Sequence, residues 1–184
     1  MEENTQEQNF NLSKIKTLPG GGLRINYQVT QNVAGETALI DRDETSSRLI
    51  HPDLQELFDA LRPIVGRVFG FTSFLTLVEG KEMGLTEGKK ALARAFADEL
   101  LKRIEIRGIA LSGSEEKRGV IITAVLETSE RVKTCINTPR LQLATETFGF
   151  EEQLTEIVEK ISAEVQAYLF KGKQAQLSLF GDDE

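Results

Sequence analysis

Hydrophobic and polar residues alternate strictly over positions 23 to 30 of the chain. The apolar members of this stretch are Leu23, Ile25, Tyr27 and Val29. The polar members between them are Arg24, Asn26, Gln28 and Thr30. A period of two places successive side chains on opposite faces of a strand, so this stretch predicts a strand with one buried and one solvated face.

Shorter patterns on either side predict two neighbouring strands. An apolar pattern over residues 10–18 indicates a first strand, which the Pro-Gly-Gly-Gly string of residues 19–22 must end. After a turn, residues 36–43 offer a partner strand with Ala38 and Ile40 directed inward. The N-terminal part of the domain is therefore expected to form a hairpin or meander.

The apolar spacing lengthens to three and four residues after Pro52, which is typical of a helix with one buried face. A helix is predicted over residues 52–68, and Pro63 should kink or divide it. A second helix is predicted over residues 86–103, with Thr86 as its N-cap. Its buried stripe is expected to comprise Ala91, Leu92, Ala95, Phe96, Leu100 and Leu101.

Strand patterns return in the second half of the chain. Residues 104–111 and 119–128 flank a polar loop and predict a hairpin. Residues 131–137 predict a further strand, and residues 141–143 could return to the sheet as an edge beyond Pro139. The sheet of the second half is thus expected to be antiparallel.

The clearest helix is the last one. Its apolar positions share one face and are Leu154, Ile157, Val158, Ile161, Val165, Tyr168 and Leu169. Acidic residues occupy its first turn, where they interact favourably with the helix dipole. The pair Lys171-Gly172 is expected to end it.

The order of elements predicts an α+β fold, in which an antiparallel sheet built as a strand meander packs against two to three helices. No internal sequence repeat is found. Residues 1–9 are polar and without periodicity, and we expect a disordered leader there. Residues 10–171 are expected to form a single domain, and residues 172–184 a flexible C-terminal tail.

Composition narrows the class of protein. The chain has 184 residues, of which 40% are hydrophobic and 28% charged, as in soluble globular proteins. No apolar run approaches the roughly 20 residues of a membrane-spanning helix, and no signal peptide is recognised. A single cysteine requires no oxidising compartment, so the cytoplasm is the expected location. The net charge of −7 disfavours tight unaided binding to DNA, although another protein could recruit such a chain to DNA.

The tail carries a conspicuous apolar cluster. Beyond the last helix, Leu177, Leu179 and Phe180 lie among polar and acidic residues. Large apolar side chains in such a tail cost solubility unless a partner covers them. The tail is therefore a candidate binding peptide.

The sequence Gln176-Leu177-Ser178-Leu179-Phe180 resembles, at all five positions, the pentapeptide by which polymerases, mismatch-repair proteins and other replication factors bind the bacterial DNA polymerase sliding clamp. The resemblance implies that the two leucines and the phenylalanine enter apolar pockets on the clamp. It also implies that Gln176 hydrogen-bonds at the rim and that the small Ser178 lets the backbone turn. Each buried anchor contributes about 1.5 to 3 kcal/mol, which leaves roughly micromolar binding after the peptide is ordered.

Two other interpretations of the tail stay open. Gln174, Leu177 and Phe180 have the spacing of a eukaryotic clamp peptide, but Gly181 stands where that peptide has a second aromatic residue. The bacterial version therefore fits better. Alternatively, the apolar residues pack on their own domain as a last strand.

No catalytic residue, metal site or cofactor is assigned. His51 is the only histidine and Cys135 the only cysteine, so no ordinary zinc site can be assembled, and His51 is expected at the surface of a helix start. Residues 20–22 are three glycines without the Lys-Ser/Thr of a phosphate-binding loop, and a turn is expected there. Carboxylates that could in principle hold Mg²⁺ for a nuclease are Asp41, Asp43, Glu44, Asp98 and Glu99. They match no nuclease signature.

For direct contact with nucleic acid, the best candidates are Lys14, Lys16 and Arg24 on the polar side of the first strands. Tyr27 would face away from that side, so it could not stack on bases there. A solvated face is the alternative interpretation.

These observations predict a non-enzymatic accessory or modulator of DNA replication, repair or recombination, recruited to the sliding clamp in a bacterium or its phage. The contact with DNA could then be indirect. The body resembles small phage and prophage proteins in general character only. Three alternatives stay open: a single-stranded-DNA-binding or annealing protein, a metal-dependent nuclease, and an inhibitor of a host clamp, which would use the same five tail residues.

Overall fold

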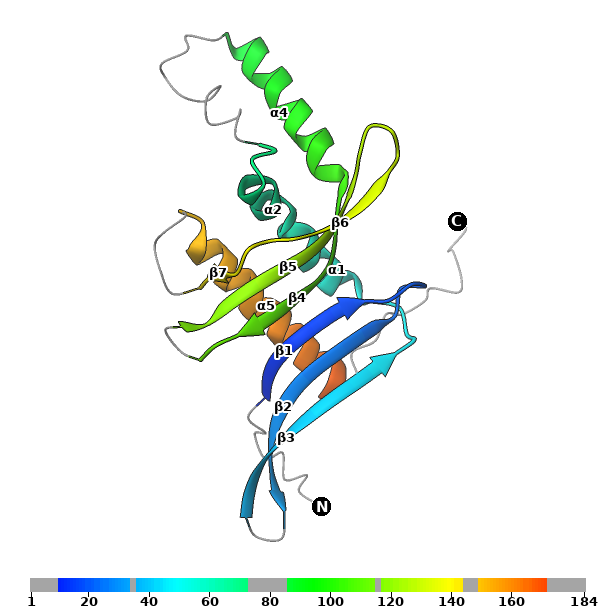
Figure 1. The fold of residues 1–184 in the computed structure, drawn as a ribbon, viewed down its shortest axis with the longest axis vertical. Coiled ribbons are helices and arrows are strands. Elements are labelled where there is room, and N and C mark those ends of the chain that lie inside the picture. Colours follow the sequence, from blue (N-terminus) through cyan, green and yellow to red (C-terminus); the bar gives the residue numbers. More distant parts are fainter. Residues whose placement is uncertain (1–9, 34–35, 73–85, 115–116, 144–148, 172–184) are drawn as a thin grey trace, which may run out of the picture.

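The computed structural model of the chain describes residues 10–33, 36–72, 86–114, 117–143 and 149–171. Its strands are β1 (Phe10–Thr17), β2 (Leu23–Val33), β3 (Glu36–Ser46), β4 (Ile104–Ser112), β5 (Gly119–Glu127), β6 (Lys133–Asn137) and β7 (Leu141–Gln142). Its helices are α1 (Pro52–Ala60), α2 (Arg62–Val68), α4 (Glu87–Lys102) and α5 (Glu151–Phe170). The predicted α+β class is confirmed (Figure 1). The predicted leader and tail lie outside the described residues.

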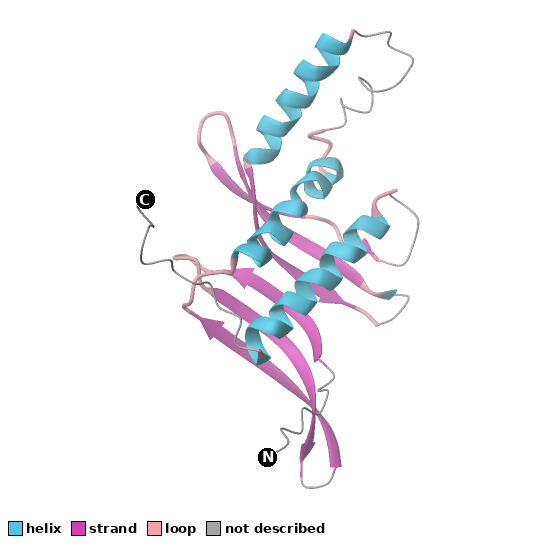
Figure 2. Ribbon diagram, turned by 180° about the vertical axis from the view of Figure 1, so that it is seen from behind, coloured by secondary structure: helices cyan, strands magenta, loops and turns pink. Residues whose placement is uncertain are grey.

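The strands form one antiparallel sheet in the order β3-β2-β1-β4-β5-β6, with β7 pairing to β5. Helices α1 and α5 lie side by side on one face of this sheet (Figure 2). The strict alternation over residues 23–30 decides which face they cover, because Ile25 and Tyr27 are buried while Arg24 is exposed. We call the opposite, solvated face the open face.

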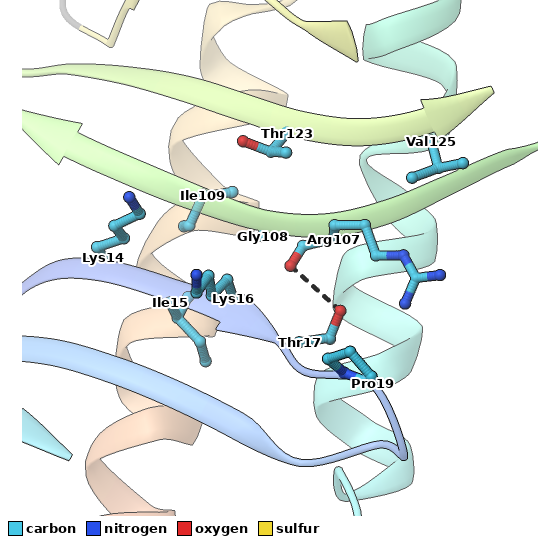
Figure 3. Close-up of a pocket in the computed structure, with 10 residues that line it drawn as sticks. All are labelled: Lys14, Ile15, Lys16, Thr17, Pro19, Arg107, Gly108, Ile109, Thr123 and Val125. Atoms are coloured by element: carbon cyan, nitrogen blue, oxygen red, sulfur yellow. Dashed lines mark hydrogen bonds between the residues drawn. The ribbon is translucent and has the colours of Figure 1, made fainter. Parts of the chain in front are cut away.

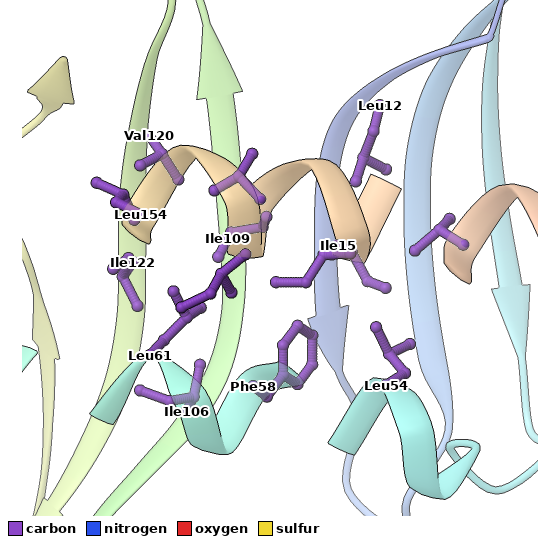
Figure 4. Packing of buried hydrophobic residues seen from close by; sticks show 14 of the residues in the cluster. Leu12, Ile15, Leu54, Phe58, Leu61, Ile106, Ile109, Val120, Ile122 and Leu154 are labelled. Carbon is purple, nitrogen blue, oxygen red and sulfur yellow. The ribbon is translucent and has the colours of Figure 1, made fainter. Parts of the chain in front are cut away.

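The core lies between the sheet and these two helices. Phe58 of α1 and Leu154 of α5 are fully buried, Phe58 near Ile15 and Leu154 near Ile122 of the sheet (Figure 4). Burial of apolar side chains of this size stabilises the fold by about 1.5 to 3 kcal/mol each. The apolar stripe predicted for the last helix is therefore what attaches α5 to the sheet.

The helix predicted after Pro52 is divided, as expected. Helix α1 ends before Leu61, and α2 begins there with Pro63 in its first turn, where the missing N–H of proline is tolerated. His51 takes the N-cap of α1, and its Nδ1 accepts a hydrogen bond from the backbone N–H of Asp53 at 3.2 Å. The only histidine thus has a structural position at a helix start, as predicted.

The prediction of a buried apolar stripe on the next helix is wrong. In α4, Ala97 is buried, whereas Leu92 is 72% and Phe96 58% exposed. The remaining members of the stripe are exposed, Ala91 and Ala95, or half-buried, Leu100 and Leu101. The reason is position: α4 extends beyond the sheet and packs on α2 and the start of β4 through another face (Figure 1). Thr86 is the N-cap residue as predicted, although its side chain makes no capping hydrogen bond.

The sheet repeats the same arrangement on either side of the β1–β4 pair. Each half is an antiparallel meander whose first strand lies at the centre, and each is followed by a helix on the same face. Both first strands carry a β-bulge, at Ser13 in β1 and at Arg107 in β4. These residues are 94 positions apart, as are Ile15 and Ile109, which pair at the centre of the sheet. The backbone therefore has an internal repeat, although no repeat was predicted from the sequence.

Candidate functional site

The predicted clamp-binding residues Gln176, Leu177, Ser178, Leu179 and Phe180 lie outside the residues that the structure describes. The end of α5, which precedes them, is held against the sheet by ring contacts and a hydrogen bond. The ring of Phe170 meets those of Phe10 and Tyr27 edge to face at 5.9 and 6.0 Å, and the Tyr168 and Ser46 hydroxyls hydrogen-bond at 2.5 Å. The chain therefore leaves the described domain at Lys171 on the helix-covered face of the sheet.

The structure brings the three predicted nucleic-acid contacts together. Lys16 of β1 lies directly opposite Arg24 of β2, and Lys14 lies opposite Asn26. On the other side of β1, the same lysines lie opposite Gly108 and Ala110 of β4. Because neither of these β4 residues has a long side chain, space remains beside the lysines on the open face.

This space takes the form of two adjoining hollows. The first hollow has a volume of about 540 Å³ (Figure 3). The side chains that matter for ligand contact come from β1, the β4 bulge and β5, and they are Lys14, Lys16, Thr17, Arg107 and Thr123. Thr17 donates a hydrogen bond from Oγ1 to the carbonyl oxygen of Arg107 at 3.3 Å. This bond ties the end of β1 to the bulge.

The second hollow extends from β4 across β1 onto β2 and also has a volume of about 540 Å³. It is lined by Ser13, Lys14, Lys16, Arg24, Asn26, Ala110 and Leu111. The internal repeat relates it to the first hollow, since each contains the bulge residue of a first strand. Lys14 and Lys16 belong to both hollows.

The arginines of the two hollows are already paired with carboxylates. Arg24 contacts Asp43 at 2.5 Å, and its hydrogen bond holds the pKa of that carboxyl below its usual value. Arg107 contacts Glu105 at 2.9 Å. Within the described ranges neither Lys14 nor Lys16 makes an ion pair, although Lys16 also lowers the pKa of Asp43 slightly through its charge. The uncompensated positive charge therefore lies over β1, between the two ion pairs.

The described lining of the hollows offers charge and hydrogen-bond donors but no aromatic ring. None of the described residues that line them is aromatic. Tyr27 faces the helices, as predicted, and is 4% exposed. Its hydroxyl donates to Glu44 at 2.5 Å, and burial together with that hydrogen bond raises its pKa to about 12. A ligand in the hollows would be held by its anionic groups.

The carboxylates considered as possible Mg²⁺ ligands lie on separate elements. Asp41 and Asp43 lie on β3, whereas Asp98 and Glu99 lie on α4 at the far end of the molecule. Among the described residues, no three His, Cys, Asp or Glu side chains gather closely enough to hold one metal ion. No helix in the described ranges is long and apolar enough to cross a bilayer.

Comparison with protein-family models, curated proteins and solved structures finds no match for this chain. Its function must therefore be argued from its own residues. Lys14, Lys16 and Arg24 were predicted from the sequence, whereas Ser13 and Arg107 were not. Both of these bulge residues interrupt the alternation of polar and apolar residues in their strands.

Proposed function

We propose that this chain is a non-enzymatic accessory or modulator of DNA replication, repair or recombination, recruited to a bacterial DNA sliding clamp through residues 176–180. The observation that carries the proposal is the match of all five residues to the clamp-binding pentapeptide. The position of the peptide supports it. Helix α5 has a buried stripe of its own, which includes Leu154, Ile161 and Val165, and the peptide follows this helix in the sequence.

The chemistry of the peptide suits a transient guest. Burial of Leu177, Leu179 and Phe180 supplies about 1.5 to 3 kcal/mol per side chain, part of which offsets the ordering of the peptide. The result is roughly micromolar affinity, near 8 kcal/mol. Such affinity allows exchange with other proteins that use the same pockets.

A binding titration on an immobilised bacterial clamp tests this proposal. We expect the full-length chain to bind at roughly micromolar concentration. The variant Leu179→Ala/Phe180→Ala should bind at least about 100-fold more weakly, because it removes two of the three anchors.

The control variant is Leu92→Ala/Phe96→Ala, which removes the same two residue types from the exposed side of α4. It should bind the clamp like the unaltered chain. Equal binding by the unaltered chain and by the tail variant would overturn the proposal, as would equal losses in both variants.

An inhibitor of a host clamp would use the same five residues, so the titration cannot separate recruitment from inhibition. Primer extension by a clamp-dependent polymerase does so. Recruitment leaves extension unchanged when the chain is present near its Kd for the clamp. Inhibition lowers extension in proportion to occupancy, and the tail variant abolishes that effect.

A further inference from the structure

We propose that the open face binds the sugar–phosphate backbone of single-stranded nucleic acid, with successive phosphates seated beside Lys14 and Lys16 in the two hollows. This function is separate from recruitment by the tail, which requires only that residues 176–180 reach a clamp. It assigns a role to the folded body.

The first argument is the repetition of the site. The two hollows have similar volumes and share β1 and β4, and they extend onto β5 and β2 respectively, as the internal repeat requires. A ligand built of repeating units, each carrying one negative charge, can occupy both with the same chemistry. Adjacent strands are about 4.8 Å apart, so the strip from β2 to β5 is roughly 14 Å wide. That width fits a few nucleotides of one strand.

The second argument is the distribution of charge. Lys14 is exposed and Lys16 half-buried, and both ammonium groups lack an ion-pair partner among the described residues. Lysine acts as a point charge for phosphate, with three rotatable donors. Asp43 on one side and Glu105 on the other neutralise the two arginines and limit the positive strip to β1. A short contact is therefore expected, which suits a chain of net charge −7.

The third argument is the kind of donor. The hollows offer ammonium, guanidinium, hydroxyl and amide groups, and none of their described lining residues has a ring on which a base could stack. Proteins that bind single strands through bases use such rings. Contact should therefore be with the backbone and largely independent of sequence.

Such a contact is weak by itself, and its strength should depend on salt. Two neutralised phosphates predict a slope of log K against log salt of about −1.4 for a single strand. A clamp that tethers the chain near DNA would raise the effective concentration of the strand into the millimolar range. Weak binding is then sufficient.

The test is fluorescence anisotropy of a labelled oligothymidylate of about 20 nucleotides, titrated with the full-length chain in about 20 mM salt. The variant Lys14→Gln/Lys16→Gln should bind at least about tenfold more weakly and lose most of the salt slope. Lys89→Gln/Lys90→Gln is the matched control, since it removes the same charge from α4. It should change binding less than about twofold.

Two further variants separate the effect of charge on the open face from the effect of the tail. Lys14→Arg/Lys16→Arg retains the charge and should retain binding, which tests whether positive charge at these two positions is what the strand requires. Leu179→Ala/Phe180→Ala should bind the oligonucleotide like the unaltered chain, so failure of this proposal is distinguishable from failure of clamp recruitment.

Several outcomes would overturn the proposal. One is that the unaltered chain does not bind the oligonucleotide in about 20 mM salt. Another is that the two glutamine variants lose the same amount of binding. The proposal would also be overturned if the chain bound a duplex of the same length more tightly, or bound pyrophosphate but not the strand.

Discussion

Gly108 lies at the contact between β1 and β4, the two strands that join the halves of the sheet. A Cβ atom at this position would lie 2.1 Å from the carbonyl oxygen of Ile15 and 2.7 Å from the Cα atom of Lys16. Both are backbone atoms, so rotation of a side chain cannot relieve the overlap. The pairing that creates the two hollows therefore requires glycine here.

We expect Gly108→Ala to lower the free energy of unfolding by about 3 kcal/mol, because β1 and β4 must separate to admit the methyl group. Gly88→Ala, in helix α4, meets nothing within 4 Å and should raise it by up to about 1 kcal/mol. Urea denaturation of both variants measures the difference. A similar small effect of the two changes would show that β1 and β4 do not approach as described.

The Arg24–Asp43 pair makes a second prediction at the scale of residues. The hydrogen bond from Arg24 lowers the pKa of Asp43 in the folded chain. The pair therefore stabilises the fold above the ordinary pKa of an aspartate, near 3.8, and this contribution is lost as the pH falls through the lowered value. Both side chains are substantially exposed, so the contribution is small.

In an NMR titration of side-chain carboxyls, Arg24→Gln should raise the pKa of Asp43 toward its ordinary value. Lys160→Gln is the control: it should leave Asp43 unchanged and instead raise the pKa of Glu156, which Lys160 holds low through a hydrogen bond. An unchanged Asp43 pKa in Arg24→Gln would contradict the pairing on the open face.

At the scale of elements, period and position carry different information. The period-two stretch over residues 23–30 predicted both the strand and its buried face, because nothing else satisfies strict alternation. The stripe of α4 was predicted equally well as apolar but wrongly as buried. Apolar residues spaced three and four apart indicate that one face of a helix is apolar. They do not indicate which element covers that face.

The two helices offer a matched test of this difference. Leu154→Ala in α5 removes a side chain that is fully buried and should cost about 2 to 5 kcal/mol of unfolding free energy. Leu92→Ala in α4 makes the same chemical change at a side chain that is 72% exposed and should cost less than about 0.5 kcal/mol. Thermal or urea unfolding measures both. Comparable losses would mean that α4 is covered in solution.

The spacing of apolar residues in the sequence carries a signal of both bulges. Leu12 and Ile15 are both buried in β1, and Ile106 and Ile109 are both buried in β4. Their spacing of three, inside strands that otherwise have a period of two, requires an extra residue in each strand. Gly108 beside Arg107 adds to the signal, since an isolated glycine in a strand often marks a bulge. Recognising both would have revealed the internal repeat.

At the scale of the whole molecule, the hollows and the end of the last described helix lie on different faces of one sheet. The hollows lie on the open face, whereas α5 ends at Lys171 on the face that the helices cover. The sequence predicted the lysines of the hollows and the tail peptide separately. It could not predict that the hollows and the end of α5 lie on opposite faces, because that depends on strand order and on where α5 packs.

Together, the two proposals predict that the chain can hold a DNA strand and a clamp at the same time. The most direct test uses a labelled oligothymidylate already saturated with the full-length chain, to which a bacterial clamp is added while anisotropy is recorded. We predict a second rise in anisotropy with the unaltered chain and none with Leu179→Ala/Phe180→Ala. No second rise with the unaltered chain, or a fall to the value of the free oligonucleotide, would contradict the account.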